Sequence, residues 1–161
     1  MIVFKDMTRQ DVPTLYAMAL RAFQPDYEKY GSFPPLLNTG KKCFRPPLAW
    51  GKAVLYNDKV IGGVFVMAKA EKGQIGAIFI DPDHQKQGYG RQMMTAIEKL
   101  YPKVKNWTLD TPSENFHLHR FYESLGYVKT GKMKPSPDDI TCFLYEKTMP
   151  PAHTACRPDC G

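Results

Sequence analysis

The distribution of proline restricts where this chain can form regular structure. The 14 prolines cluster towards the two ends, and only Pro82, Pro102 and Pro112 lie between residues 51 and 134. Proline interrupts helices and central strands, because its ring fixes φ and removes the backbone donor. The middle of the chain is therefore predicted to hold the regular core. Residues 31–50 are predicted to form a long irregular loop, of the kind that often covers or binds a ligand.

Hydrophobic periodicity and turn residues divide the chain into alternating elements. Asp11 is expected to cap the first helix, and Gly126 to end the last one. The order of elements predicts an α/β fold in which helices cover a mixed sheet. Strands are expected at residues 2–5, 53–56, 60–70, 73–80, 104–110, 127–130 and 141–148, and helices at about 11–23, 88–101 and 115–125.

Length and composition favour one soluble, cytoplasmic domain. The 161 residues fit a single domain over residues 1–149, followed by a tail at residues 150–161 that we expect to be flexible. The chain has no apolar run long enough to span a membrane and no secretory signal at its N-terminus. The net charge is +6, but the basic residues come singly or in pairs, which argues against nucleic-acid binding.

Cysteine usage indicates neither a disulfide framework nor a metal site. Two of the four cysteines, Cys43 and Cys142, are far apart, and Cys156 and Cys160 lie in the tail. With His153, the tail offers three ligands where a structural zinc site needs four. We expect reduced thiols and no bound metal.

The densest local signal is a strand, a glycine-rich turn and a helix at residues 75–94. Gly88 and Gly90 lie where the backbone must bend into the helix, and Lys86 and Arg91 flank the turn. The free N–H groups of a helix's first turn favour an anion such as a pyrophosphate. The glycine spacing fits neither a Walker A loop nor a dinucleotide fingerprint, and an ordinary strand–helix connection would look similar.

Two segments carry a resemblance to a known family. Residues 85–90, QKQGYG, are similar to the Q/R-x-x-G-x-G/A signature of the GNAT superfamily of acyl-CoA-dependent N-acetyltransferases. Residues 115–127 resemble its N-x-x-A-x-x-x-Y-x-x-x-G-F segment, with Leu118 in place of Ala and Tyr127 in place of Phe. The resemblance extends over about residues 2–149. It implies a mostly antiparallel sheet of six or seven strands with splayed central strands and about four helices.

The resemblance also implies acetyl-CoA as co-substrate. Its pyrophosphate would lie at the glycine turn, and its pantetheine arm between the splayed strands, pairing with backbone. A backbone N–H near Phe79 or Ile80 would stabilise the oxyanion. The implied cofactor-binding residues are Ile78, Phe79, Ile80, Gln85, Lys86, Gln87, Gly88, Tyr89, Gly90, Arg91 and Asn115.

Acetyl transfer requires a base, because an alkylamine with a pKa near ~10 is protonated at neutral pH. It also requires an acid, because the leaving thiolate needs a proton. Tyr122 matches the family's catalytic tyrosine. Asp110, twelve residues earlier, matches the acidic residue of ribosomal-protein N-terminal acetyltransferases, whereas the alternative position holds Gln74. Asp110 as a strand-end residue or helix cap, and a water-mediated route, remain open.

The acceptor is less constrained than the cofactor. Phe23, Tyr27, Tyr30 and Phe33 are candidate substrate-binding aromatics, with Asp26 and Glu28 able to hold a cationic amine. His117 and His119 point about 200° apart on their helix, so we expect both to face solvent rather than bind a metal. A small-molecule amine is the expected acceptor; a protein N-terminus or lysine, and a non-catalytic acyl-CoA sensor, are the alternatives. The resemblance also allows a homodimer.

Overall fold

The computed structural model describes residues 1–30, 50–134 and 141–151. The predictions for Phe33, for most of the 31–50 loop and for the cysteines of the tail lie outside this part of the chain. Within it, every strand and helix expected from the sequence is present.

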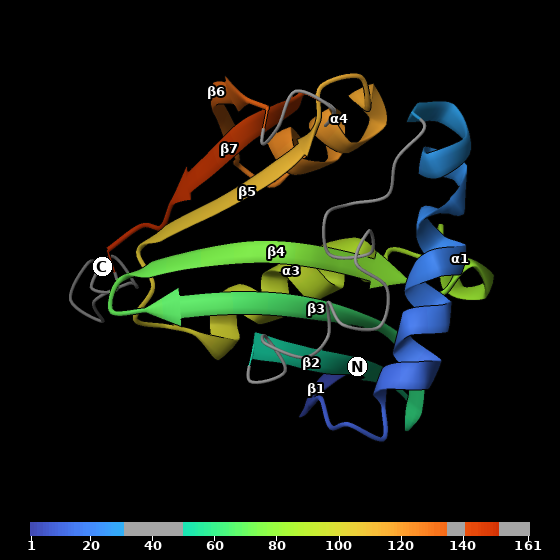
Figure 1. The fold of residues 1–161 in the computed structure, drawn as a ribbon. Coiled ribbons are helices and arrows are strands. Elements are labelled where there is room, and N and C mark those ends of the chain that lie inside the picture. The colour runs from blue at the N-terminus through green and yellow to red at the C-terminus, as the bar shows by residue number, and fades with distance from the viewer. Residues whose placement is uncertain (31–49, 135–140, 152–161) are drawn as a thin grey trace.

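The described residues form one seven-stranded sheet in the order β1-β2-β3-β4-β5-β7-β6 (Figure 1). All neighbours are antiparallel except β4 and β5, which are parallel. The sheet is therefore mixed and mostly antiparallel, as expected. The strands are β1 (Ile2–Asp6), β2 (Gly51–Tyr56), β3 (Lys59–Lys69), β4 (Lys72–Ile80), β5 (Asn106–Pro112), β6 (Val128–Met133) and β7 (Cys142–Thr148).

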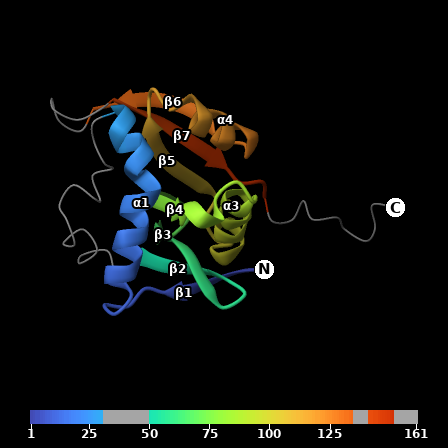
Figure 2. The ribbon, with the colours of Figure 1, turned by 90° about the vertical axis from the view of Figure 1, so that its right-hand side faces the viewer.

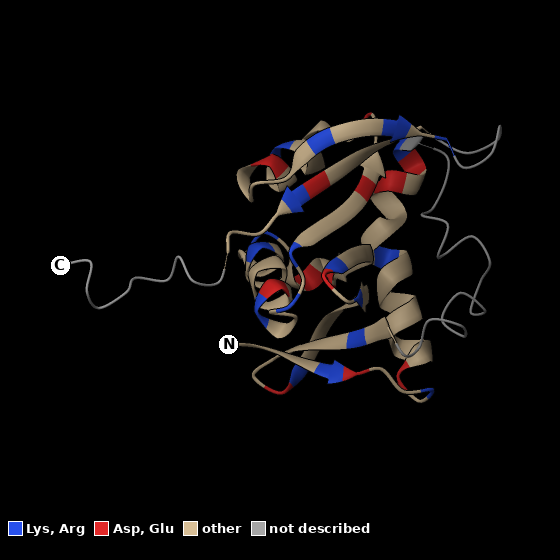
Figure 3. Cartoon of the chain, turned by 90° about the vertical axis from the view of Figure 1, so that its left-hand side faces the viewer, with Lys and Arg blue, Asp and Glu red and all other residues tan. Residues whose placement is uncertain are grey.

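Three α-helices cover the sheet within the described residues, one fewer than the family resemblance implied. They are α1 (Val12–Tyr30), α3 (Tyr89–Leu100) and α4 (Phe116–Ser124), and a short 3-10 helix, η3 (Pro82–His84), precedes α3. Figures 1 and 2 show α1 on one face of the sheet and α3 on the other, with α4 against β5 and β7. Basic and acidic residues are interspersed over the side drawn in Figure 3.

The helix α1 is longer than predicted, because it continues through Pro25 to Tyr30. Proline was taken as a stop, but Pro25 is exposed and the preceding turn is held against the sheet, where the Phe23 ring meets Phe79 at a centroid distance of 6.3 Å. The cap prediction was half right. The Asp11 carbonyl accepts the Leu15 N–H, whereas its carboxylate accepts from Thr8 instead of from the helix.

Apolar residues pack on both faces of the sheet. On the α3 face the core includes Trp107, which is fully buried, together with Met93 and Ile97 of the helix. On the α1 face, Leu15 packs with Phe65 of β3. Burying both faces stabilises the sheet and fixes the positions of the elements around β4.

The strands β4 and β5 pair over only three residues. Lys72–Gln74 pairs with residues 106–108, and no pairing of the two strands follows. On its other side β4 contains a bulge: Phe65 pairs with Ala77 and Val66 with Ile75, which leaves Gly76 between them. A bulge bends a strand, so β4 leaves β5 with alternate backbone N–H and C=O groups facing an opening. These strands are splayed, as the resemblance implied.

The close approach of β3 to β4 leaves no room for a side chain at Gly62, which can be tested by substitution. A Cβ at this position would lie 2.2 Å from the carbonyl oxygen of Phe79, a backbone atom that cannot rotate away. We expect Gly62→Ala to lower the free energy of unfolding by about 1–3 kcal/mol in urea denaturation. Gly131→Ala is the control, because its Cβ would meet Leu144 at 3.8 Å. Equal stability of both variants would contradict this packing.

Candidate active site

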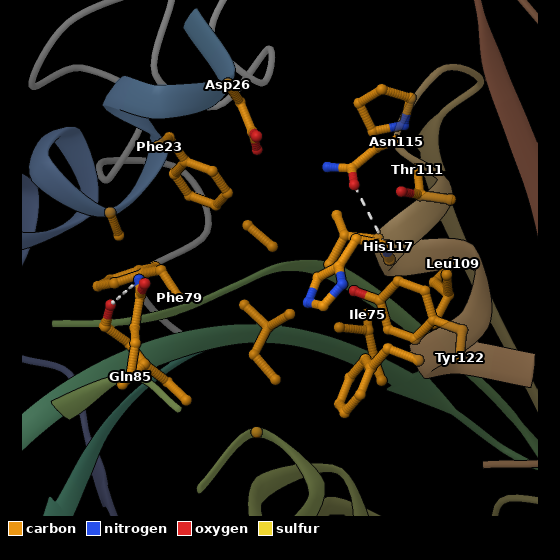
Figure 4. Close-up of a pocket in the computed structure, with 18 of the residues that line it drawn as sticks. Phe23, Asp26, Ile75, Phe79, Gln85, Leu109, Thr111, Asn115, His117 and Tyr122 are labelled. Atoms are coloured by element: carbon orange, nitrogen blue, oxygen red, sulfur yellow. Dashed lines mark hydrogen bonds between the residues drawn. The ribbon is translucent and has the colours of Figure 1, made fainter. Parts of the chain in front are cut away.

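A cavity of about 750 Å³ opens where β4 and β5 diverge. Its walls come from α1, β4, the turn between η3 and α3, β5 and α4 (Figure 4). Residues as far apart in the sequence as Ala22 and Cys142 therefore face one space.

The turn before α3 has a backbone suited to binding an anion. Lys86 has φ +64° and Gly88 has φ +82°, both in the left-handed region, and α3 begins at Tyr89. Such alternation turns successive N–H groups to the same side, next to the positive end of the helix. A Cβ at Gly88 would meet nothing within 4 Å, so its conformation rather than crowding favours glycine here.

Two side chains fix the entrance to this turn. Asp81, which is buried, accepts the Asp83 N–H at 3.1 Å with one carboxylate oxygen and pairs with Arg21 of α1 at 3.1 Å with the other. The amide of Gln85 donates to the Ile80 carbonyl at 3.1 Å. The end of β4, the turn and α1 are thus connected by polar contacts.

The cavity brings together nearly all of the predicted cofactor-binding residues. Gln87 is the exception, since it is exposed and does not line the cavity. Along β4, Phe79 packs towards α1, and its neighbours Ile78 and Ile80 pack towards α3. The predicted residues that line the cavity are Ile78, Phe79, Ile80, Gln85, Lys86, Gly88, Tyr89, Gly90, Arg91 and Asn115.

Tyr122 is only 6% exposed and presents its hydroxyl to the cavity (Figure 4). The hydroxyl makes no hydrogen bond to another described residue. Burial raises the pKa of the Tyr122 phenol well above its usual range, and the charge of Asp110 raises it further. The phenol is therefore held protonated at neutral pH, as a proton donor must be.

Asp110 and Leu109 point to opposite sides of β5, as alternation along a strand requires: Leu109 is buried, and Asp110 is exposed to the cavity. The surrounding walls still remove enough water to raise the pKa of the Asp110 carboxyl. The alternative role of Asp110 as a helix cap is excluded, because the Oδ1 of Asn115 caps α4 by accepting the Leu118 N–H at 3.2 Å.

Of the two histidines of α4, both expected to face solvent, His117 is exposed but His119 is not. His119 is buried: its Nε2 lies 2.8 Å from the Pro112 carbonyl oxygen and its ring is 5.0 Å from that of Phe143, because β7 covers this side of α4. His117 is exposed but lines the cavity, and Figure 4 shows its imidazole on the same side as the Tyr122 hydroxyl. Helical periodicity correctly predicted that the two imidazoles point in different directions, but it could not predict which elements each one faces.

Only part of the predicted acceptor surface lies at the cavity. Phe23 and Asp26 line it, whereas Tyr27 is 43% exposed and lies outside it. Glu28 is also outside, and accepts from Gln24 at 3.4 Å. The side chain of Tyr30 and all of Phe33 are beyond what the structure describes.

Three His, Cys, Asp or Glu side chains arranged to hold a metal ion are not found in residues 1–30, 50–134 and 141–151. No helix of these segments is both long and apolar enough to cross a membrane.

The sequence matches the model of the acetyltransferase (GNAT) family over residues 12–127. The chain belongs to this family. Its fold is also that of solved acetyltransferases. The PaiA N-acetyltransferase of Thermoplasma acidophilum, in complex with coenzyme A, is 15% identical with a TM-score of 0.75, over 92% of this chain and 99% of that one.

Two further structures show the same fold. The ribosomal-protein-S18-alanine N-acetyltransferase of Escherichia coli is 20% identical with a TM-score of 0.73, over 98% of this chain and 99% of that one. A GNAT acetyltransferase of Elizabethkingia anophelis with acetyl-CoA bound is 17% identical with a TM-score of 0.69, over 92% and 98%. No curated protein matches the sequence significantly.

Gly88 allows the backbone of the turn to be tested without a steric clash. Gly88→Val is expected to lower the free energy of unfolding by about 1–2 kcal/mol, because a β-branched residue is strained at positive φ. Gly88→Asn should cost less than half as much, since asparagine tolerates this conformation. Thermal denaturation of both variants measures the difference. Equal losses would show that the turn does not require positive φ.

Proposed function

We propose that the protein is an N-acetyltransferase that moves the acetyl group of acetyl-CoA directly to a primary amine of a small molecule. The observation that carries this proposal is one cavity that joins an anion-binding turn to Tyr122 and Asp110. Membership of the GNAT family supports it, as does the presence of coenzyme A or acetyl-CoA in structures of the same fold.

The residues of the cavity suit the parts of acetyl-CoA. The backbone N–H groups after Lys86 would hold the pyrophosphate, with the Lys86 and Arg91 side chains adding positive charge. The unpaired edge of β4 beyond Gln74 offers backbone groups to the two amides of the pantetheine arm. Asn115 lies on the opposite wall, where its side-chain NH₂ remains available while its oxygen caps α4.

The proposed reaction assigns one proton transfer to each catalytic residue. Asp110 takes a proton from the acceptor's ammonium, and the neutral nitrogen attacks the thioester carbonyl. A backbone N–H on the free edge of β4 stabilises the oxyanion. As the carbon–sulfur bond breaks, Tyr122 gives its proton to the thiolate. The nitrogen then loses its second proton, so that one proton in all is released to solvent.

Tyr122→Phe separates chemistry from binding. The hydroxyl it removes has no hydrogen-bond partner among the described residues, so stability should change little. We expect kcat to fall by about 10²–10⁴-fold, because a positioned acid is lost, while the Kd of acetyl-CoA measured by calorimetry stays within about twofold. An unchanged kcat would remove Tyr122 from the mechanism.

Asp110→Asn should lower activity and raise stability. The folded protein binds the Asp110 proton more tightly than the unfolded chain, so ionisation of this carboxyl at neutral pH opposes folding. The variant should therefore melt at a higher temperature at pH 7 than the wild type, and this gain should vanish below the unfolded pKa. The wild-type rate should fall as pH falls through the raised pKa. An Asn variant with wild-type kcat would exclude Asp110 as the base and favour the water-mediated route.

The overall proposal is tested by acetyl-CoA calorimetry together with a thiol-release assay over a panel of small amines and peptides. Binding with turnover of small amines supports it. Turnover of peptides alone would make the protein a peptide acetyltransferase. Binding without turnover on any acceptor would favour an acyl-CoA sensor, and absence of binding would overturn the assignment of the turn.

A further inference from the structure

Two carboxylates face the cavity from different walls. Asp26 comes from α1 and Asp110 from β5, and both line the cavity. Neither makes a hydrogen bond or a salt bridge to another residue that the structure describes. Acidic side chains elsewhere do: Asp81 pairs with Arg21, and Glu98 with Lys147 at 2.8 Å. Outside the cavity, the described carboxylates that have no such partner, Asp58, Asp83 and Glu114, are exposed at the surface.

Ionised Asp26 and Asp110 side chains are energetically unfavourable in the cavity. Removal from water raises the pKa of both carboxyls above its ordinary value. At Asp26 the charge of Lys29, one turn further along α1, acts in the opposite direction but does not outweigh burial. Partly buried carboxylates are ordinarily paired with a cation, and here a ligand is the natural source of one.

A second and independent observation points to a ligand in the same place. Thr111 is 2% exposed and lines the cavity, and its hydroxyl has no hydrogen-bond partner among the described residues. Figure 4 shows this oxygen turned towards the cavity. A buried hydroxyl without a partner costs about 1–3 kcal/mol, so a donor or acceptor from a bound molecule would relieve it. Thr111 directly follows Asp110 on β5, so its side chain leaves the strand on the side of Leu109, and both Thr111 and Asp110 line the same cavity.

Between the two walls the surface is aromatic and apolar. The Phe23 side chain lies next to Asp26 in Figure 4, with Phe79 beyond it. A phenyl face of this kind accommodates a methylene chain and also attracts an ammonium group. The wall therefore suits an aliphatic chain whose charged end reaches Asp26.

The other charged and titratable side chains of the cavity do not neutralise the Asp26 and Asp110 carboxylates. Lys86, Arg91 and His84 belong to the turn, where the pyrophosphate would bind, and Lys29 leaves the raised pKa of Asp26 in place. From α4, His117 faces the cavity beside Tyr122. The cavity thus has carboxylates on two of its walls, which α1 and β5 form.

We infer that the acceptor is an aliphatic amine that carries a second positive charge, with Asp26 binding the remote ammonium and Asp110 receiving the reacting one. The inference rests on the proposed function. Only the reacting nitrogen changes: it loses two of its three protons and forms the bond to the acetyl carbon, while the carbon–sulfur bond breaks and the thiolate takes the Tyr122 proton, which the nitrogen's second proton replaces. The remote ammonium keeps its charge throughout, so Asp26 is a specificity-determining residue.

The test compares amines that differ only in the second charge. Linear diamines of three to five carbons and the monoamines of the same length are assayed by thiol release with acetyl-CoA and the full chain. At least one diamine is expected to exceed its monoamine by about tenfold or more in kcat/KM, the size of one charge-assisted hydrogen bond.

Asp26→Asn is the matched variant. It should raise KM for the diamine by about tenfold with kcat nearly unchanged, and leave the monoamine unaffected. Glu28→Gln is the control, because Glu28 lies on the same helix outside the cavity and should leave both substrates unchanged. Circular dichroism and calorimetry with acetyl-CoA confirm that both variants fold and bind.

The outcomes separate this inference from the proposed function. If monoamines react as well as diamines, or if Asp26→Asn leaves the diamine KM unchanged, the second charge is not recognised and the inference is overturned while the acetyltransferase stands. If acetyl-CoA binds but neither amine reacts, the inference and the small-amine acceptor both fail. Loss of acetyl-CoA binding by the wild type would overturn the function itself.

Discussion

The brief pairing of β4 with β5 is the constraint on which the rest of the site depends. Three residues of each strand form a parallel contact, after which the bulge at Gly76 carries β4 away. An interrupted ladder leaves backbone donors and acceptors unpaired in the middle of a sheet, an arrangement that proteins ordinarily avoid. Here the sheet is held together around the gap by the α1 and α3 cores and by β7 on the far side of β5. The gap is therefore a stable opening that an amide-bearing ligand can pair with.

Much of this fold could be predicted because its signals are local. Alternation along the strands and the turn at Asn57 and Asp58, both at positive φ, placed each strand within a few residues of its observed bounds. The end of α1 could not be placed in this way, since the rule that proline ends a helix ignores the packing of Phe23 that holds the next turn. The position of the bulge could not be predicted from the sequence either, because it arises from the register of β4 on β3, which depends on both strands together.

In the candidate site, too, the residues of a local motif could be predicted, whereas those whose surroundings come from distant elements could not. Residues of the glycine turn were found because the motif fixes backbone and side chains within six positions, and Gln87 is the exception because alternation within the turn points it outwards. The burial of His119 and the cavity positions of His117 and Thr111 depend on what β7, β4 and α1 place opposite them. No spacing rule within one segment carries that information. Distinguishing Asp26 from Glu28 likewise required knowing which side of α1 faces the opening.

The ion pair between Arg21 and Asp81 joins the helix that bears Asp26 to the loop that leads into the turn. The two binding regions of the cavity are thus mechanically linked, and a coupling free energy between two sites is reciprocal. Under the proposed function, free energy of acceptor binding that positions α1 would also favour coenzyme binding at the turn, and the reverse would hold equally. Because the Arg21 side chain is 57% exposed, ionic strength screens this link from the solvent side. Under the proposed function, ionic strength would then change the cooperativity between acceptor and coenzyme as well as the affinity for each.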